Sequence, residues 1–171
     1  MTEIQQTEVE ALAEKISSAY DKLHIEGIPS AYTLSSEEVE ALYAAGYQLF
    51  RQGDLDRSTT IFNYLCIYEH QDARFWIALA VALQKQKKLE QAIDAYSAAA
   101  LLDATNIRPY FHATECLIES RQWNRAEQSL DAFFLICENF SNGEKAGVRQ
   151  LIGKAEIWRD LIRSKRVRQT K

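Results

Sequence analysis

Hydrophobic and small residues recur every 34 positions between residues 39 and 140, and three windows that begin at Val39, Ala73 and Ile107 align without a gap. In each window a large residue comes fourth, a small residue eighth and an apolar residue eleventh. A leucine or tryptophan follows at position seventeen, a small residue at twenty and an apolar residue at twenty-four. The first window supplies Leu42, Gly46, Leu49, Leu55, Ser58 and Phe62 at these positions.

This pattern is typical of the tetratricopeptide repeat, in which two antiparallel helices cross at small residues and large residues fill the space between them. The chain has only two prolines and six glycines, which also favours helices. The sequence therefore predicts an all-α fold. It consists of three tandem repeats in a right-handed helical solenoid, with an N-terminal helical extension and a C-terminal capping helix.

Capping and turn residues set the predicted boundaries. Ser35 and Glu38 form a capping signal, Gly53 supplies a turn, and Asp72 and Asn106 cap the second and third repeats. The repeat helices are expected at residues 37–52, 55–68, 73–86, 89–102, 108–120 and 123–139, and a last helix at residues 144–163. The predicted domains are an extension at 1–34, three repeats at 35–141, a capping helix at 142–163 and a basic tail at 164–171.

The N-terminal extension contains an amphipathic helix at residues 8–23. Its apolar stripe needs a partner surface, and two interpretations are open. The stripe either caps the first repeat or meets a second copy of the chain in a dimer. The residues of the stripe, which are the dimerisation candidates, are Val9, Leu12, Ile16 and Tyr20.

Composition excludes several classes of protein. A net charge of -4 and a pI near 5.5 argue against a nucleic-acid partner. No apolar run approaches the ~20 residues of a membrane span, and the first residues lack a signal-peptide pattern, so we expect a cytoplasmic protein without membrane insertion. The three cysteines are expected to be reduced, buried thiols.

Candidate catalytic chemistry is sparse. His112 and Cys116 lie four positions apart on one predicted helix, but two ligands do not make a metal site. There is no glycine-rich phosphate loop, HExxH motif or CxxC pair. We therefore expect no enzyme, no cofactor and no metal.

The first helix of each repeat, here called the front helix, lines the concave inside of the solenoid. The residues of these helices that face inward indicate a binding function. Tyr43, Tyr47 and Phe50 follow one another at helical spacing, while Leu42 and Leu49 already fill the core positions of that helix. An exposed aromatic patch implies a partner that covers it, and an extended peptide suits such a groove. Some tetratricopeptide repeats bind the C-terminal carboxylate of a partner through a lysine and an asparagine at the fifth and ninth positions of their first repeat. Here Tyr43 and Tyr47 stand at those positions, so this binding mode is excluded. The predicted groove residues are Tyr43, Tyr47, Phe50, Arg74, Ile77, Val81, Gln84, Arg108, Phe111 and Glu115.

Four segments resemble one known family. They are LYAAGYQLFRQGDL (42–55), IFNYLCIYEHQDARFW (61–76), AIDAYSAAALLD (92–103) and RPYFHATECLIESRQWNRAEQSL (108–130). They look like the class II chaperones of bacterial type III secretion systems, which serve the translocator proteins that form a pore in a host membrane. The resemblance also adds Tyr68 to the groove residues.

The resemblance implies a non-enzymatic chaperone in the bacterial cytosol that keeps hydrophobic translocators soluble and secretion-competent. In the family an extended N-terminal segment of the translocator lies in the concave groove, and members form homodimers when unbound. An alternative is a repeat scaffold or a needle-subunit helper within a secretion assembly.

Overall fold

The computed structural model describes residues 34–169, with side chains up to residue 165. Within that range the chain forms α-helices and no strand, so the all-α prediction is confirmed for this part of the chain. The helices are α2 (Ser36–Gln52), α3 (Leu55–Tyr68), α4 (Ala73–Lys85), α5 (Leu89–Leu102), α6 (Ile107–Glu119), α7 (Trp123–Glu138), α8 (Asn142–Gly147) and α9 (Arg149–Gln169).

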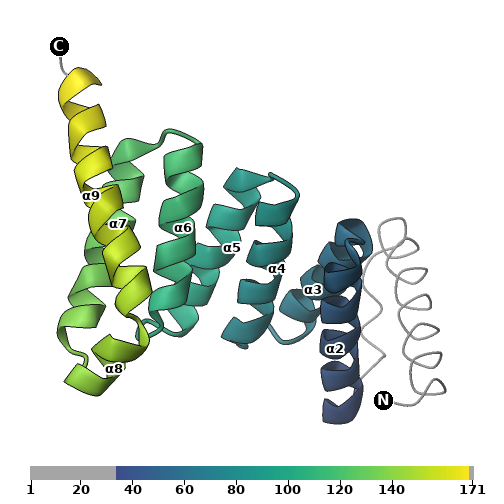
Figure 1. Ribbon diagram of the computed structural model, residues 1–171. Helices are drawn as coiled ribbons and strands as arrows, with labels where there is room; N and C mark the ends of the chain where they lie inside the picture. Colours follow the sequence, from purple (N-terminus) through teal and green to yellow (C-terminus); the bar gives the residue numbers. More distant parts are fainter. Residues whose placement is uncertain (1–33, 170–171) are drawn as a thin grey trace. The chain divides into compact units, whose positions relative to one another are not determined.

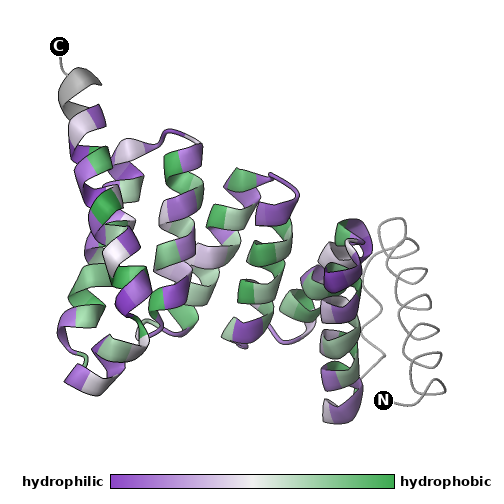
Figure 2. Cartoon of the chain, in the orientation of Figure 1, coloured by the Kyte–Doolittle hydropathy of each residue, from purple (hydrophilic) through white to green (hydrophobic). Residues whose placement is uncertain are grey.

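The chain divides into two compact units, Met1–Gln86 and Lys87–Lys171. In the described part of unit 1, α3 packs against both α2 and α4. In unit 2, α6 packs against α5 and α7, while α9 lies on α7 and also contacts α6 (Figure 1). Hydrophobic and hydrophilic residues alternate around these helices, so each unit builds its own apolar interior (Figure 2).

Side-chain caps start the helices where the sequence predicts them. The Ser35 amide donates to the Glu38 carboxylate at 2.7 Å, and the Glu38 amide donates to the Ser35 hydroxyl at 3.2 Å. Asp72 and Asn106 accept from the second amide beyond them, at 2.8 and 3.0 Å. These bonds satisfy first-turn amides that have no partner within the helix.

The same turn position in each window adopts the left-handed conformation. Gly53 has φ 85°, and the residues 34 and 68 positions later, Lys87 and Arg121, have φ 61° and 59°. Only glycine adopts this conformation without steric cost. The turn geometry of the repeat is thus kept even where the sequence has lost the glycine.

The crossing of α2 and α3 depends on Gly46. A Cβ atom added there would lie 2.6 Å from Cε1 of Phe62, a ring that is 1% exposed. The buried Ser58 hydroxyl donates to the Gly46 carbonyl at 3.0 Å and links the same two helices. The two backbones approach this closely because neither residue carries a large side chain at the crossing.

The C-terminal helix differs from its prediction. One helix was expected at residues 144–163, but the structure has α8 and α9, separated at Val148 (φ -115°, ψ 12°). Ser141 and Glu144 form a capping box that starts α8, and Gly147, a poor helix former, ends it. α9 then continues to Gln169, so the expectation of a helix end near residue 163 was wrong.

Gly46→Ala is expected to lower the free energy of unfolding by roughly 1–3 kcal/mol, because the added methyl group meets the enclosed Phe62 ring. Gly153→Ala in α9 is the matched control, since its Cβ meets nothing within 4 Å. In that variant the higher helix propensity of alanine is expected to raise the free energy of unfolding by at most ~1 kcal/mol. Urea denaturation followed by circular dichroism measures both, and equal stability of Gly46→Ala and wild type would contradict the packing argument.

Candidate partner-binding faces

The front of unit 1 carries an aromatic face, defined here as Tyr43, Tyr47 and Phe50 of α2 with Ile77, Val81 and Gln84 of α4. The core positions of α2 point the other way, since Leu42 is fully buried and Leu49 is 7% exposed. Tyr47 is 39% exposed, and the other members of the face are half-buried. The face therefore presents apolar surface to solvent on a helix whose core side is already filled.

The two tyrosines rest on core rings. Tyr43 packs against Tyr47 with ring centroids 5.0 Å apart and against Phe75 of α4 at 5.2 Å. Phe62 of α3 lies 6.0 Å from Tyr43 and 5.4 Å from Tyr47. Burial, with a weak hydrogen bond to Tyr47, raises the pKa of the Tyr43 hydroxyl. The aromatic face is thus held in place by the interior of unit 1.

Arg74 fixes the edge of this face. Its guanidinium bonds the Glu40 carboxylate at 2.8 Å and the Asp72 carboxylate at 2.7 Å. The same group lies 5.5 Å from the Tyr43 ring centroid, within cation–π range. Burial tends to raise the pKa of Asp72, but the hydrogen bonds from Arg74 outweigh it and lower that pKa. Two carboxylates neutralise Arg74, so it orients Tyr43 and offers little net charge to a ligand.

Tyr68 serves a contact inside the chain. Its hydroxyl accepts from the Leu34 amide at 2.6 Å and donates to the Leu34 carbonyl at 3.1 Å. Its ring stacks on Tyr64, with centroids 6.1 Å apart. These bonds tie the entry of α2 to the end of α3, and a role for Tyr68 in partner binding stays a prediction.

Unit 2 does not leave Phe111 in an open groove, so that prediction was wrong. Phe111 is 3% exposed, because Trp158 of α9 covers it at a centroid distance of 4.7 Å. Lys154 lies over both rings, at 5.5 and 4.7 Å, and its ammonium bonds Glu115 of α6 at 2.8 Å. The chain's own C-terminal helix occupies the place where a partner was expected.

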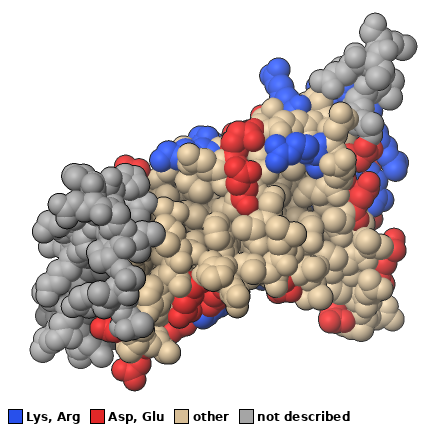
Figure 3. Space-filling model, turned by 180° about the vertical axis from the view of Figure 1, so that it is seen from behind, with Lys and Arg blue, Asp and Glu red and all other residues tan. Residues whose placement is uncertain are grey.

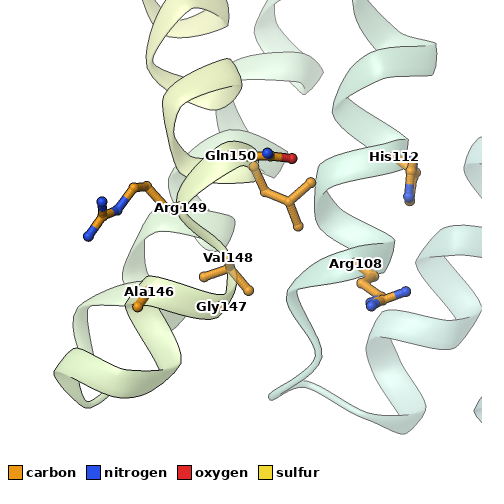
Figure 4. A pocket seen from close by; sticks show the side chains of 8 residues that line it. Arg108, His112, Ala146, Gly147, Val148, Arg149 and Gln150 are labelled. Carbon is orange, nitrogen blue, oxygen red and sulfur yellow. The ribbon is translucent and has the colours of Figure 1, made fainter.

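A pocket of about 740 Å³ lies beside this contact, between α6 and the turn from α8 to α9. Arg108 and His112 line it from α6, and Val148 and Arg149 line it from the α8–α9 turn, where the Arg149 side chain points away from α6 (Figure 4). The remaining lining residues are Ala146, Gly147, Gln150 and Leu151. Of the predicted groove residues, Arg108 belongs to this pocket.

Comparisons with known proteins place the chain and its fold in one family. A model of the tetratricopeptide repeat matches residues 75–106. The low calcium response locus protein H of Yersinia pestis is 32% identical over 97 residues, which is 57% of this chain and 58% of that protein. The match thus spans little more than half the length of that relative.

Solved structures extend the match to about three quarters of this chain and nearly the whole of theirs. PcrH of Pseudomonas aeruginosa, in complex with the chaperone binding region of PopB, is 30% identical and has a TM-score of 0.64. The similarity covers 73% of this chain and 97% of that one. The chain belongs to the translocator chaperones of type III secretion systems.

A second structure agrees with this assignment. The Yersinia enterocolitica type III secretion chaperone SycD, in complex with a peptide of the translocator YopD, is 27% identical with a TM-score of 0.71. The match covers 79% of this chain and 99% of the SycD chain. The chaperone described here therefore belongs to a family of binding proteins and not of enzymes.

Metal-ligating side chains do not gather in the described part of the chaperone. No group of three His, Cys, Asp or Glu residues that could hold an ion occurs there. His112 Nδ1 lies 3.6 Å from a Glu115 oxygen, and the Cys116 thiol is fully buried.

None of the described helices is both long and apolar enough to span a membrane. The dimerisation candidates Val9, Leu12, Ile16 and Tyr20 lie outside the described residues.

The three cysteines of the chaperone are expected to resist thiol reagents until it unfolds. Burial raises the pKa of Cys66 and of Cys116 to about 12 and also raises that of Cys137. At pH 8 a thiol of pKa 12 is about one part in ten thousand thiolate, against roughly a quarter for an unperturbed thiol of pKa about 8.5. Intact mass after iodoacetamide treatment should show no adduct in buffer and three in urea, and rapid labelling of the folded chaperone would contradict this.

Proposed function

We propose that this chaperone binds an extended, apolar N-terminal segment of a translocator on the aromatic face of unit 1. The observation that carries the proposal is Tyr47, which is 39% exposed between half-buried Tyr43 and Phe50 although the core side of α2 is complete. A partner that covers this side chain gains on the order of 1–2 kcal/mol from the removal of apolar area from water.

The α4 side of the face extends the apolar surface. Ile77 and Val81 lie one helical turn apart and are half-buried, with Gln84 following on the same side. Gln84 ends this apolar surface with a polar amide group. The complexes of PcrH with a region of PopB and of SycD with a YopD peptide support a translocator as the partner.

The physical role follows from solubility. A translocator enters a membrane and therefore exposes apolar segments that aggregate in water. A chaperone that binds the unassembled form lowers the free concentration of the aggregation-prone state by mass action. The site of action is the bacterial cytosol. A homodimer of the unbound chaperone belongs to the same proposal, and SycD has been solved as a dimer.

Tyr47→Ala is expected to weaken binding of a co-expressed translocator at least tenfold and to lower the unfolding free energy less than Tyr43→Ala does, because Tyr47 is 39% exposed and Tyr43 is more buried. Tyr43→Ala removes contacts to Phe75 and Phe62 and should lower both binding and stability. Co-purification yield and melting curves separate the two effects.

The matched control is Leu101→Ala with Ile157→Ala, which removes two apolar side chains that are 87% and 70% exposed outside the face. This control should retain the translocator. Full retention by the variant that carries both Tyr43→Ala and Tyr47→Ala would rule out the aromatic face as the site.

Arg74→Gln is expected to weaken translocator binding severalfold through loss of the contacts that orient Tyr43, with a stability change below about 1 kcal/mol, because the ion pairs are exposed. Arg57→Gln is the control, since Arg57 pairs only locally, with Asp54 at 2.6 Å. Titration calorimetry with a translocator peptide measures the effect, and equal affinities of the two variants would contradict a positioning role for Arg74.

A further inference from the structure

The pocket between α6 and the α8–α9 turn of unit 2 has a cationic rim. Arg108 and Arg149 supply its charged side chains, and no aspartate or glutamate lines it. This is unusual for a chain with a net charge of -4. A local surplus of positive charge in an acidic protein is therefore concentrated around one cavity of unit 2.

The two arginines are not neutralised within the described residues. Neither Arg108 nor Arg149 forms an ion pair there, whereas Arg74 in unit 1 is held by two carboxylates. The nearby carboxylate of Glu115 is engaged by Lys154 at 2.8 Å. Both guanidinium groups thus keep their five donors available to an external carboxylate.

The lining between the arginines is apolar and small. Val148 and Leu151 are half-buried, Ala146 adds a methyl group, and a Cβ atom built on Gly147 meets nothing within 4 Å. Arg108 and Arg149 lie on opposite sides of Val148, and their side chains point away from each other (Figure 4). This divergent arrangement suits two separate carboxylates that flank an apolar side chain better than it suits one carboxylate held by both arginines.

We propose that this pocket binds an acidic, extended segment of a partner protein, with an apolar side chain against Val148 and Leu151 and flanking carboxylates at Arg108 and Arg149. The site is separate from the aromatic face and does not depend on it. A polypeptide is favoured over a nucleic acid because the middle of the pocket is apolar and the net charge of the chain repels a polyanion. On the face shown in Figure 3 most of the described surface is uncharged, so no broad basic surface is seen there either.

The test uses a fluorescein-labelled, end-blocked peptide of sequence Ser-Asp-Leu-Glu-Ser and the full chain, with fluorescence anisotropy at low ionic strength. Wild type should bind the peptide, and the double variant Arg108→Gln with Arg149→Gln should bind it about fivefold or more weakly. Lys88→Gln with Arg163→Gln is the matched control. It removes the same charge from exposed positions of unit 2 outside the pocket and should bind as wild type.

Further arms decide between this proposal and its alternatives. A peptide in which lysines replace the two acids should not bind, and Tyr47→Ala should bind the acidic peptide as wild type does. The proposal is overturned by no wild-type binding at millimolar peptide, by equal binding to both double variants, or by loss of binding in Tyr47→Ala. Binding of a five-nucleotide single-stranded DNA with equal affinity and the same arginine dependence overturns it as well, since the pocket would then select charge alone.

Discussion

The close contact between Phe62 and Gly46 is the constraint on which unit 1 depends. The Phe62 ring fills the notch left by the missing side chain, since a Cβ at Gly46 would come within 2.6 Å of it. The same ring supports Tyr43 and Tyr47, with centroids 6.0 and 5.4 Å away. One buried side chain therefore fixes the crossing of α2 and α3 and also holds up the surface that we assign to partner binding. Both the stability of unit 1 and the proposed binding surface depend on this contact, so Gly46 and Phe62 tolerate little change in side-chain volume.

One arrangement of side chains occurs in both units. In unit 1 the rings of Tyr43 and Phe75 lie 5.2 Å apart, with Arg74 over both and paired to Glu40. In unit 2, Phe111 and Trp158 lie 4.7 Å apart, with Lys154 over both and paired to Glu115. An aromatic pair, a cation and a carboxylate thus join a front helix to the next helix on its side. The fifth residue of the window is a packing residue in both cases.

The sequence predicts the helices well and the exposure of individual residues less well. The bounds of α3 and α5 are as predicted and those of α2, α4, α6 and α7 differ by one residue at most, because the 34-residue register and the caps at Ser35, Asp72 and Asn106 are local signals. Phe111 was misplaced because its burial depends on Trp158, which lies 47 positions later and outside the repeat. The aromatic and apolar spacing of α9 indicated a capping helix, but periodicity does not show which residue of α6 it would reach. The pocket was missed for the same reason.

The two arrangements differ at the ninth residue of the window, and this difference supports the binding surface that we propose. In the third window that residue is Glu115, whose carboxylate is used by Lys154 to attach α9. In the first window it is Tyr47, which is 39% exposed and whose ring neighbours among the described residues are Tyr43 and Phe62. A polar residue at this position completes the packing of the chain on itself, whereas an aromatic one leaves apolar area uncovered. A partner that covers this area would remove it from water, and for that reason the site that we propose is centred on Tyr47 and not on the more buried Tyr43.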